Sequence, residues 1–289
     1  MGFFVGFQTV EVEDNGTSFP MAVMYPTEAA AEIITVGPYE LEVAKNAIPT
    51  GEGLPLVIIS HGSGGSHLVY RTLASHLAAH GFVVAMPEHP FDNRRDNSLD
   101  GTIENLVNRP RHLRAIINWF YDQSAFQKIL KPDATSVIGH SMGGYTALAV
   151  AGGVPLSFPR ESADGLEKAV DVIKDVRVKA LVLMAPATVW YRTVGALDQV
   201  DVPILMLVGE KDKYTPSFHS QIVLKGLPES TEIIHRVVEN AGHFSFLSPF
   251  PPTMSGPAFL PAQDPAGFDR VQFHETLNAE ILTFLQSKF

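Results

Sequence analysis

The chain has 289 residues, of which 45% are hydrophobic and 18% are charged, so it is long and apolar enough to bury a large core. Acidic residues outnumber basic ones by 31 to 21, and the resulting formal charge of −10 argues against nucleic acid as a partner. Cysteine is absent, which excludes disulfides, thiolate nucleophiles and cysteine-based metal sites.

The first residues, Met-Gly-Phe-Phe-Val-Gly-Phe, lack the basic segment and long apolar run of a signal peptide. Gly6 stands where a myristoylation pattern needs Ser or Thr. No apolar run is long enough to span a bilayer. We therefore expect a soluble, cytoplasmic protein without a membrane span, and the sequence does not indicate its oligomeric state.

Short apolar segments set the order of the predicted strands. Residues 1–50 are predicted to form antiparallel edge strands and a loop, with Asp14-Asn-Gly16 as a hairpin turn. Five runs rich in Val, Ile and Leu predict strands buried on both faces, at residues 54–60, 82–87, 135–139, 178–185 and 202–209. A sixth, more polar run at 231–238 predicts an edge strand.

Helical periodicity separates these runs. Residues 70–80 place Leu73 and Leu77 one turn apart and end at a glycine, which predicts a helix. Asn108-Arg-Pro110 is predicted to cap and open the next helix. Its apolar stripe is formed by Leu113, Ile116, Ile117 and Phe120.

Two further helices are predicted at 144–151 and 269–289. We interpret the basic cluster Arg109-Pro-Arg-His-Leu-Arg114 as the solvated face of its helix.

The alternation of strands and helices predicts an α/β fold with a mostly parallel, doubly wound sheet and antiparallel N-terminal edge strands. We expect a single domain over residues 1–289. Residues 153–177, a proline-containing loop with a mixed helix, and 248–268, a proline-rich ordered loop, interrupt the pattern. Both are expected to be insertions near the site. Together with residues 91–108, they could form a small cap that restricts substrate size.

The stretch Gly139-His-Ser141-Met-Gly143 follows a predicted buried strand and precedes a predicted helix. This setting is typical of a nucleophile elbow, in which a serine sits on a strained turn and the flanking glycines remove side-chain clashes. The alternative is a glycine-rich turn with an incidental serine. The context favours Ser141 as a nucleophile.

A serine hydroxyl needs a base and an acid to activate it. Asp212 and His243 follow the last two predicted strands, at the sheet edge where Ser141 is expected, so the three form a candidate catalytic triad. Glu210 stays open as an alternative acid. Asp198 and Asp201 precede their strand and are expected at the opposite edge.

Eleven histidines compete for the role of base. His61 and His140 flank glycine-containing turns and are expected to hydrogen-bond to backbone, while His235 lies inside a predicted strand. Only His243 occupies a loop after the last strand. Its neutral imidazole would accept the serine proton, and Asp212 would hold the tautomer.

Acyl transfer also needs donors for the developing oxyanion. The backbone N–H of Met142 is one candidate, and that of Ser63 in the glycine-rich stretch at 60–65 is the other. A plain turn or a phosphate loop is the alternative for this stretch. Neither Gly-Lys-Ser/Thr nor G-x-G-x-x-G is present, which disfavours nucleotide binding.

These residues together resemble the α/β-hydrolase superfamily, over nearly the whole chain from Leu54 onward. Within it, the chain is similar to the branch of platelet-activating-factor acetylhydrolases and predicted dienelactone hydrolases. The similar stretches are Ser60-His-Gly, Gly139-His-Ser-Met-Gly-Gly-Tyr-Thr-Ala-Leu148, His243-Phe-Ser-Phe-Leu-Ser-Pro249, Asp269-Arg270 and Phe273-His274.

The resemblance implies an α/β-hydrolase fold, serine-dependent hydrolysis of carboxylic esters, no metal and no organic cofactor. It also supports Ser63 and Met142 as oxyanion donors. Dienelactone hydrolases proper use a cysteine nucleophile, which this chain lacks, so the resemblance implies no dienelactone substrate. Members of the branch often carry cysteines in the loop after the histidine, whereas this loop has prolines and apolar residues.

Aromatic side chains are expected around the site and would suit an apolar acyl or alcohol group. Phe91, Trp190, Tyr191 and Phe244 are the predicted substrate contacts, although any one of these rings is as compatible with the core. The predicted function is a metal-independent serine esterase acting on small or medium esters. Alternatives are an amidase or peptidase, an acyltransferase, or a binding protein that retains the triad.

Overall fold

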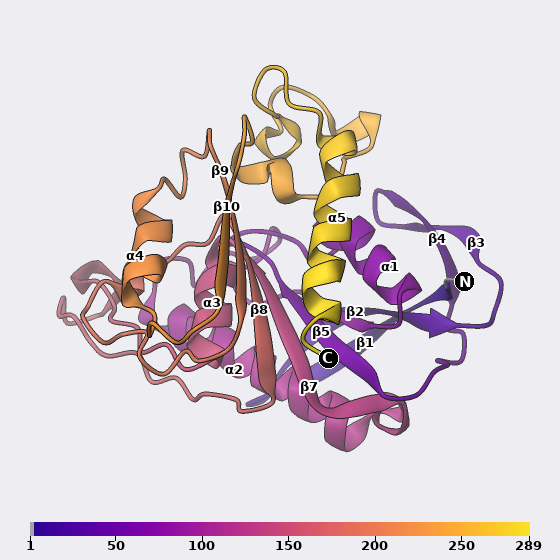
Figure 1. Ribbon diagram of the computed structural model, residues 1–289, viewed down its shortest axis with the longest axis horizontal. Coiled ribbons are helices and arrows are strands. Elements are labelled where there is room, and N and C mark those ends of the chain that lie inside the picture. Colours follow the sequence, from indigo (N-terminus) through magenta and orange to yellow (C-terminus); the bar gives the residue numbers. More distant parts are fainter. Residues whose placement is uncertain (1–2) are drawn as a thin grey trace.

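The computed structural model describes residues 3–289, which form a ten-stranded sheet and the helices and loops around it (Figure 1). The strand order is β10-β9-β8-β7-β5-β6-β2-β1-β4-β3. The strands from β10 to β6 in this order run parallel to one another. They are β5 (Leu54–Ser60), β6 (Val83–Pro87), β7 (Leu130–His140), β8 (Val178–Met184), β9 (Ile204–Gly209) and β10 (Ile233–Val238). The predicted mostly parallel α/β sheet is confirmed.

The N-terminal strands extend this sheet at one edge. They are β1 (Phe4–Asp14), β2 (Thr17–Thr27), β3 (Glu32–Val36) and β4 (Tyr39–Lys45). β2 pairs antiparallel with both β1 and β6. The β1–β2 turn consists of Asn15 and Gly16, both at positive φ (50° and 79°), as a type I′ turn requires. The predicted antiparallel N-terminal strands are confirmed.

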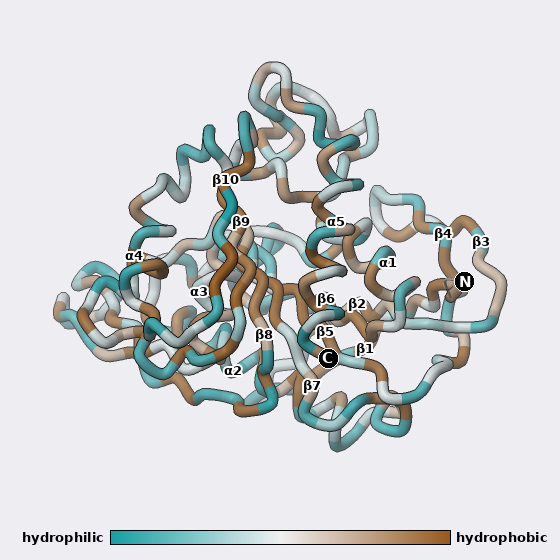
Figure 2. Tube along the Cα trace, viewed as in Figure 1, coloured by the Kyte–Doolittle hydropathy of each residue, from teal (hydrophilic) through white to brown (hydrophobic). Residues whose placement is uncertain are grey.

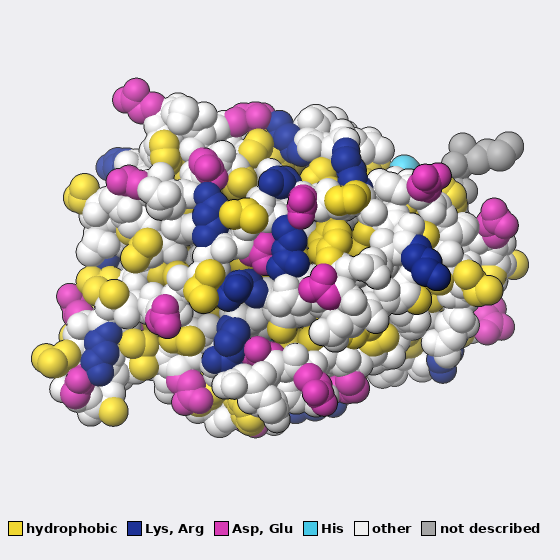
Figure 3. Space-filling model, turned by 90° about the horizontal axis from the view of Figure 1, so that it is seen from below, with side chains coloured by type: hydrophobic (Ala, Val, Ile, Leu, Met, Phe, Trp, Pro, Cys, Tyr) yellow, Lys and Arg dark blue, Asp and Glu magenta, His cyan; other side chains and the backbone are white. Residues whose placement is uncertain are grey.

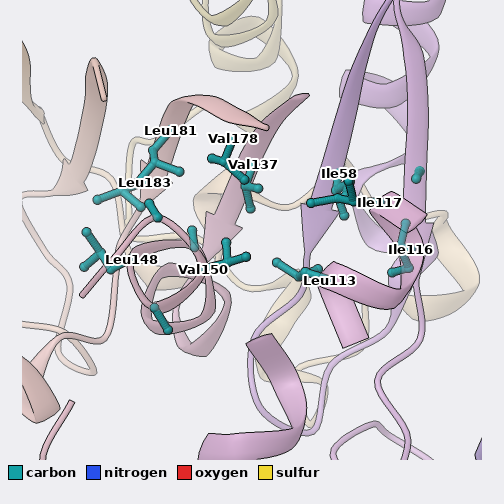
Figure 4. Close-up of a cluster of buried hydrophobic side chains, with 14 of the residues drawn as sticks. Ile58, Leu113, Ile116, Ile117, Val137, Leu148, Val150, Val178, Leu181 and Leu183 are labelled. Carbon is teal, nitrogen blue, oxygen red and sulfur yellow. The ribbon is translucent and has the colours of Figure 1, made fainter. Parts of the chain in front are cut away.

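Helices cover both faces of the sheet, because its central strands are apolar on both sides (brown in Figure 2). On one face lie α2 (Ile103–Asn118), α3 (Met142–Val150) and α4 (Phe218–Gly226). On the other lie α1 (Arg71–Ala79) and α5 (Arg270–Gln286). Figure 4 shows side chains of the first face, where Ile58 and Val137 of the sheet lie near Leu113 of α2. The fold is therefore doubly wound.

Helix α2 begins earlier than the sequence predicts. Its N-cap is Thr102, whose hydroxyl accepts a hydrogen bond from the Asn105 backbone N–H, and Pro110 lies inside the helix. A proline in a helix leaves the carbonyl four residues earlier without its usual donor. Here that carbonyl belongs to Leu106, and it accepts from the Tyr145 hydroxyl of α3 at 2.9 Å. The predicted start at 108–110 is wrong because a neighbouring helix replaces the lost bond.

The structures of the two irregular segments, 153–177 and 248–268, agree with the sequence predictions to different degrees. Residues 153–177 form only one 3-10 turn, Pro159–Glu161, so the mixed helix predicted there is wrong. Several apolar residues of this segment stay exposed, which removes the packing that would stabilise an amphipathic helix. Residues 248–268 form a loop with short 3-10 turns at Pro252–Met254 and Leu260–Ala262.

The sequence analysis of a signal peptide includes Met1 and Gly2. These two residues lie outside the described part of the chain. Within 3–289, none of the helices combines the length and hydropathy needed to cross a bilayer.

Candidate active site

Ser141 occupies the turn between β7 and α3 in a backbone conformation that non-glycine residues rarely adopt. Its φ is 53° and its ψ is −118°. Three backbone hydrogen bonds hold this geometry. Its N–H donates to Met184 at 3.1 Å, and its carbonyl accepts from Gly144 at 2.8 Å and from Ala187 at 2.9 Å. The end of β8 and the first turn of α3 therefore fix the strained turn from both sides.

The flanking glycines are required by close backbone contacts. A Cβ atom at Gly139 would lie 2.1 Å from the carbonyl oxygen of Gly143. A Cβ atom at Gly143 would lie 1.9 Å from the carbonyl oxygen of Ser60, at the end of β5. Because both obstacles are backbone atoms, no side-chain movement could relieve them.

Asp212 and His243 follow β9 and β10 and contact each other. The His243 Nδ1 lies 2.8 Å from the Asp212 Oδ2, and both side chains are buried. Burial raises the pKa of Asp212, but the hydrogen bond and charge of His243 and the donors of Thr215 outweigh it and lower the pKa to about 2. A carboxylate only accepts hydrogen bonds, so Nδ1 carries the proton and Nε2 is left as the acceptor.

The alternative acids lie elsewhere. Glu210 accepts a hydrogen bond from the Asn240 N–H at 2.9 Å in an exposed position, and Asp201 pairs with Lys174 at 2.8 Å. Asp198 is exposed. Of the carboxylates weighed from the sequence, Asp212 is the one that contacts His243.

His140 holds the loop of His243 rather than competing with it. Its Nε2 donates to the His243 carbonyl at 2.9 Å, so its Nδ1 accepts from the Tyr70 hydroxyl at 3.0 Å. Burial lowers the pKa of His140 to about 3, with a smaller contribution in the same direction from His243. The ring is therefore neutral and its tautomer is fixed. His61 likewise donates to backbone, from Nδ1 to the Gly62 carbonyl at 2.7 Å.

The glycine-rich stretch at 60–65 is anchored by a buried ion pair. Arg109 of α2 pairs with Asp92 at 2.6 Å, and its guanidinium also donates to the Thr146 hydroxyl at 2.9 Å and to the His61 carbonyl. The other Asp92 oxygen accepts from the Ser63 hydroxyl at 2.7 Å and from the Gly64 N–H at 3.0 Å. The candidate oxyanion loop and the helix after Ser141 are thus joined through one guanidinium.

This arrangement corrects the interpretation of the basic cluster as a solvated face. Arg109 and His112 are fully or almost fully buried, because α2 turns this face toward the sheet and Asp92 compensates the charge. Asp92 was missed in the sequence analysis. Its position after β6, at the same sheet edge as the other site residues, is the signal that could have identified it.

Behind this loop lies a cluster of buried imidazoles. The ring of His89 lies 4.9 Å from that of His61 and 5.6 Å from that of His112, between ring centroids. The His89 Nε2 is 2.9 Å from the Ser60 hydroxyl. Burial, reinforced by the charge of Arg109, lowers the pKa of His61 and His112 to about 3 and that of His89 well below its usual value. The cluster is therefore neutral.

The two candidate oxyanion donors lie near Ser141. Met142 is the first residue of α3, where a backbone N–H has no partner within the helix. Ser63 lines a cavity of about 620 Å³ that is also lined by Ser141 and His243. A smaller cavity of about 310 Å³ shares Ser63 and Ser141 and is lined by Met142 as well.

The larger cavity is mostly apolar. Trp190 and Phe244, two of the predicted substrate contacts, line it, as do residues from the loop at 248–268. Phe91 and Tyr191 do not line it. Phe91 is 39% exposed, and Tyr191 is buried in the core with its hydroxyl donating to the Tyr145 carbonyl at 2.8 Å.

Charges of both signs are mixed on the surface facing the viewer in Figure 3, where Lys and Arg side chains are interleaved with Asp and Glu. Within the described part of the chain, no three His, Asp or Glu side chains are grouped so that they could hold a metal ion.

Comparisons with known proteins agree with this architecture. The family model of "Platelet-activating factor acetylhydrolase, isoform II" matches residues 22–103. A platelet-activating factor acetylhydrolase of Bos taurus is 45% identical over 53 residues, and one of Cavia porcellus is 44% identical over 55 residues. These matches cover 18% and 19% of this chain, and only 11% and 12% of the length of the two relatives.

A solved structure extends the likeness to the whole fold. The ferulic acid esterase from Streptomyces cinnamoneus aligns with a TM-score of 0.73 and 17% identity, over 99% of this chain and 90% of that one. At this identity the match concerns the fold alone. The resemblance to platelet-activating factor acetylhydrolases is confirmed over the matched segment, and the chain shares the fold of the ferulic acid esterase.

Proposed function

We propose that this chain is a metal-independent serine hydrolase that cleaves carboxylic esters of small or medium size through an acyl-enzyme. One observation carries the proposal. Ser141, which has a strained backbone, and His243 line one mostly apolar cavity, which Ser63 also lines. Asp212 is hydrogen-bonded to His243. The matched acetylhydrolases support it, although they share only a short segment with this chain.

In the proposed reaction, the His243 Nε2 accepts the hydroxyl proton of Ser141 while the serine oxygen attacks the ester carbonyl. The backbone N–H groups of Ser63 and Met142 stabilise the oxyanion of the tetrahedral intermediate. The imidazolium, stabilised by the Asp212 carboxylate, then gives its proton to the leaving alcohol. Water repeats the sequence on the acyl-enzyme and releases the acid.

Asp212 supplies two effects in this scheme. Its pKa of about 2 keeps it anionic at neutral pH, so it holds the Nδ1–H tautomer and stabilises the charged ring. Thr215 fixes the carboxylate, donating from its N–H at 2.9 Å and from its hydroxyl at 2.7 Å.

Substrate contacts are proposed for Trp190 and Phe244. The Glu161 carboxylate accepts from the Trp190 Nε1 at 3.0 Å and thereby holds the indole at the junction of the two cavities. A cavity of about 620 Å³ accommodates esters of small to medium size.

The test is covalent labelling with a fluorophosphonate probe, followed by mass spectrometry of the modified peptide. We expect label on Ser141 in the wild type and none in Ser141→Ala, together with a loss of ester hydrolysis of about 10⁴-fold or more. Ser136→Ala is the matched control, because it removes a buried hydroxyl from β7, the strand that precedes Ser141, and Ser136 does not line the cavity.

Circular dichroism and urea unfolding establish that each variant is folded. A folded wild type that takes no label and hydrolyses no ester would refute the proposal. If Ser141 is labelled but no ester is hydrolysed, turnover of amides would assign the same triad to an amidase. Transfer of the acyl group to an added alcohol would assign it to an acyltransferase.

A further inference from the structure

One wall of the larger cavity carries an exposed, positively charged side chain that forms no ion pair with any of residues 3–289. Arg94 is the one lining side chain with a permanent charge among those that the structure describes. Its backbone N–H donates to the Gly65 carbonyl at 2.8 Å, which fixes it beside the candidate oxyanion loop. Its neighbour Arg95 lies 3.9 Å from Glu88, whereas no carboxylate of residues 3–289 lies within 4.0 Å of the Arg94 guanidinium.

A second guanidinium reinforces this charge from behind the wall. Arg71 lies over the ring of Tyr39, with its Cζ 4.0 Å from the ring centroid, and it donates to the Pro249 carbonyl. It too has no carboxylate within 4.0 Å among the described residues, and its Nη1 is buried without a protein acceptor. The charge of Arg71 is therefore poorly screened by water.

Tyr39 lines the cavity and contacts Arg71. Burial raises the pKa of its hydroxyl, although the charges of Arg71 and Arg94 act in the opposite direction, so the group is a neutral donor at physiological pH. Within the described chain no protein atom accepts a hydrogen bond from this hydroxyl. A phenol donor and an unpaired guanidinium thus line one mostly apolar cavity, and a second guanidinium without an ion-pair partner among the described residues lies over the Tyr39 ring.

We propose that Arg94 and the Tyr39 hydroxyl, with the field of Arg71 behind them, bind an anionic group of the substrate. The inference rests on the proposed function. It defines the substrate class as esters that carry a carboxylate or a phosphate at the end of an apolar stem. The stem lies along apolar lining residues such as Val69, Leu247 and Phe250, and the scissile carbonyl lies at Ser141.

Both chemistries suit this subsite, because a guanidinium and a phenol donate equally well to carboxylate and phosphate oxygens. In a protein with a net charge of −10, a distant surface would repel such substrates. The two arginines provide a local positive charge that offsets this repulsion.

The test compares matched esters that differ only in the charged group. On the acyl side, monomethyl adipate is compared with methyl hexanoate. On the alcohol side, 4-carboxyphenyl and 4-phosphonooxyphenyl butyrate are compared with phenyl butyrate, which also separates carboxylate from phosphate recognition. The readout is the ratio of kcat/KM for the anionic ester to kcat/KM for its neutral partner.

We expect Arg94→Gln to lower this ratio at least tenfold for one anionic ester, and Tyr39→Phe to lower it about threefold. The control is Arg95→Gln, which removes the same charge from the adjacent residue. Both arginines are exposed, but Arg95 does not line the cavity, so this variant should leave the ratio unchanged. Salt should lower the ratio in the wild type and much less in Arg94→Gln. A ratio within twofold of the wild type in Arg94→Gln, or an equal fall in Arg95→Gln, overturns the proposal.

Calorimetric titration of Ser141→Ala with monomethyl adipate and methyl hexanoate measures the same preference without turnover. If the anionic ester binds in a way that depends on Arg94 but the wild type hydrolyses no ester, the proposed function is refuted and the subsite is retained. Hydrolysis of neutral esters with no preference for anions in either assay refutes the subsite alone.

Discussion

Helix α2 carries two Arg–Asp pairs that provide a matched test of burial. Arg109–Asp92 and Arg111–Asp14 both have an N–O distance of 2.6 Å, yet the first pair has 0% exposed side chains and the second has 36% and 12%. Replacing Asp92 by Asn leaves the Arg109 charge buried without a counter-ion, which costs about 3–5 kcal/mol. Replacing Asp14 by Asn removes a partly solvated pair, which costs about 0–1 kcal/mol.

The assay is urea unfolding of wild type, Asp92→Asn and Asp14→Asn at pH 7, with the free energy of unfolding extrapolated to water. We expect the first variant to be less stable than the second by at least about 2 kcal/mol. Equal losses in the two variants would refute the argument that the loop at 60–65 is anchored through a desolvated charge. Asp92→Asn should also lower the rate of ester hydrolysis, because Asp92 holds Ser63 and Gly64.

Two further substitutions test contacts made by helix α3. Gly143→Ala should prevent folding or cost at least about 4 kcal/mol, because its Cβ would overlap the Ser60 carbonyl, whereas Gly256→Ala, with no atom within 4 Å, should be neutral in thermal unfolding. Tyr145→Phe should cost about 1–3 kcal/mol in urea unfolding, because it leaves the Leu106 carbonyl opposite Pro110 without a donor. Unchanged stability of Tyr145→Phe would mean that this carbonyl has another partner.

The sequence was informative where one residue pattern permits one local structure. Buried parallel strands read as continuous apolar runs, so the central strands were predicted closely. The turn at Asn15-Gly16 was predictable because both residues adopt positive φ. The start of α2 was not, since the pattern around Pro110 fits a helix start equally well and only the contact with Tyr145 decides otherwise.

The residues of the candidate site were likewise predictable in part. Ser141, Asp212 and His243 were identified because each follows a predicted strand, and chain order alone places them at one edge of a parallel sheet. Asp92 and Arg109 were not identified, because a charged residue on a helix is usually solvated and its burial depends on a partner 17 residues away. The positions of Phe91 and Tyr191 depended on side-chain directions that the local sequence does not determine.

The buried imidazoles near the candidate oxyanion loop also set a limit on the conditions in which this fold persists. His61, His89, His112 and His140 all have pKa values lowered by burial, whereas each would titrate near 6.5 in the unfolded chain. Below that pH the unfolded chain takes up protons that the folded protein excludes, so stability is fully present above about pH 6.5 and falls as the pH decreases toward 3.

A ring that stays neutral in the folded protein lowers the stability by at most about 1.4 kcal/mol for each pH unit below pH 6.5. A typical domain has only about 5–15 kcal/mol of stability, so losses of this order are significant. We therefore expect these four buried rings to make the protein less stable in acid, so that its free energy of unfolding in urea falls as the pH decreases below about 6.5.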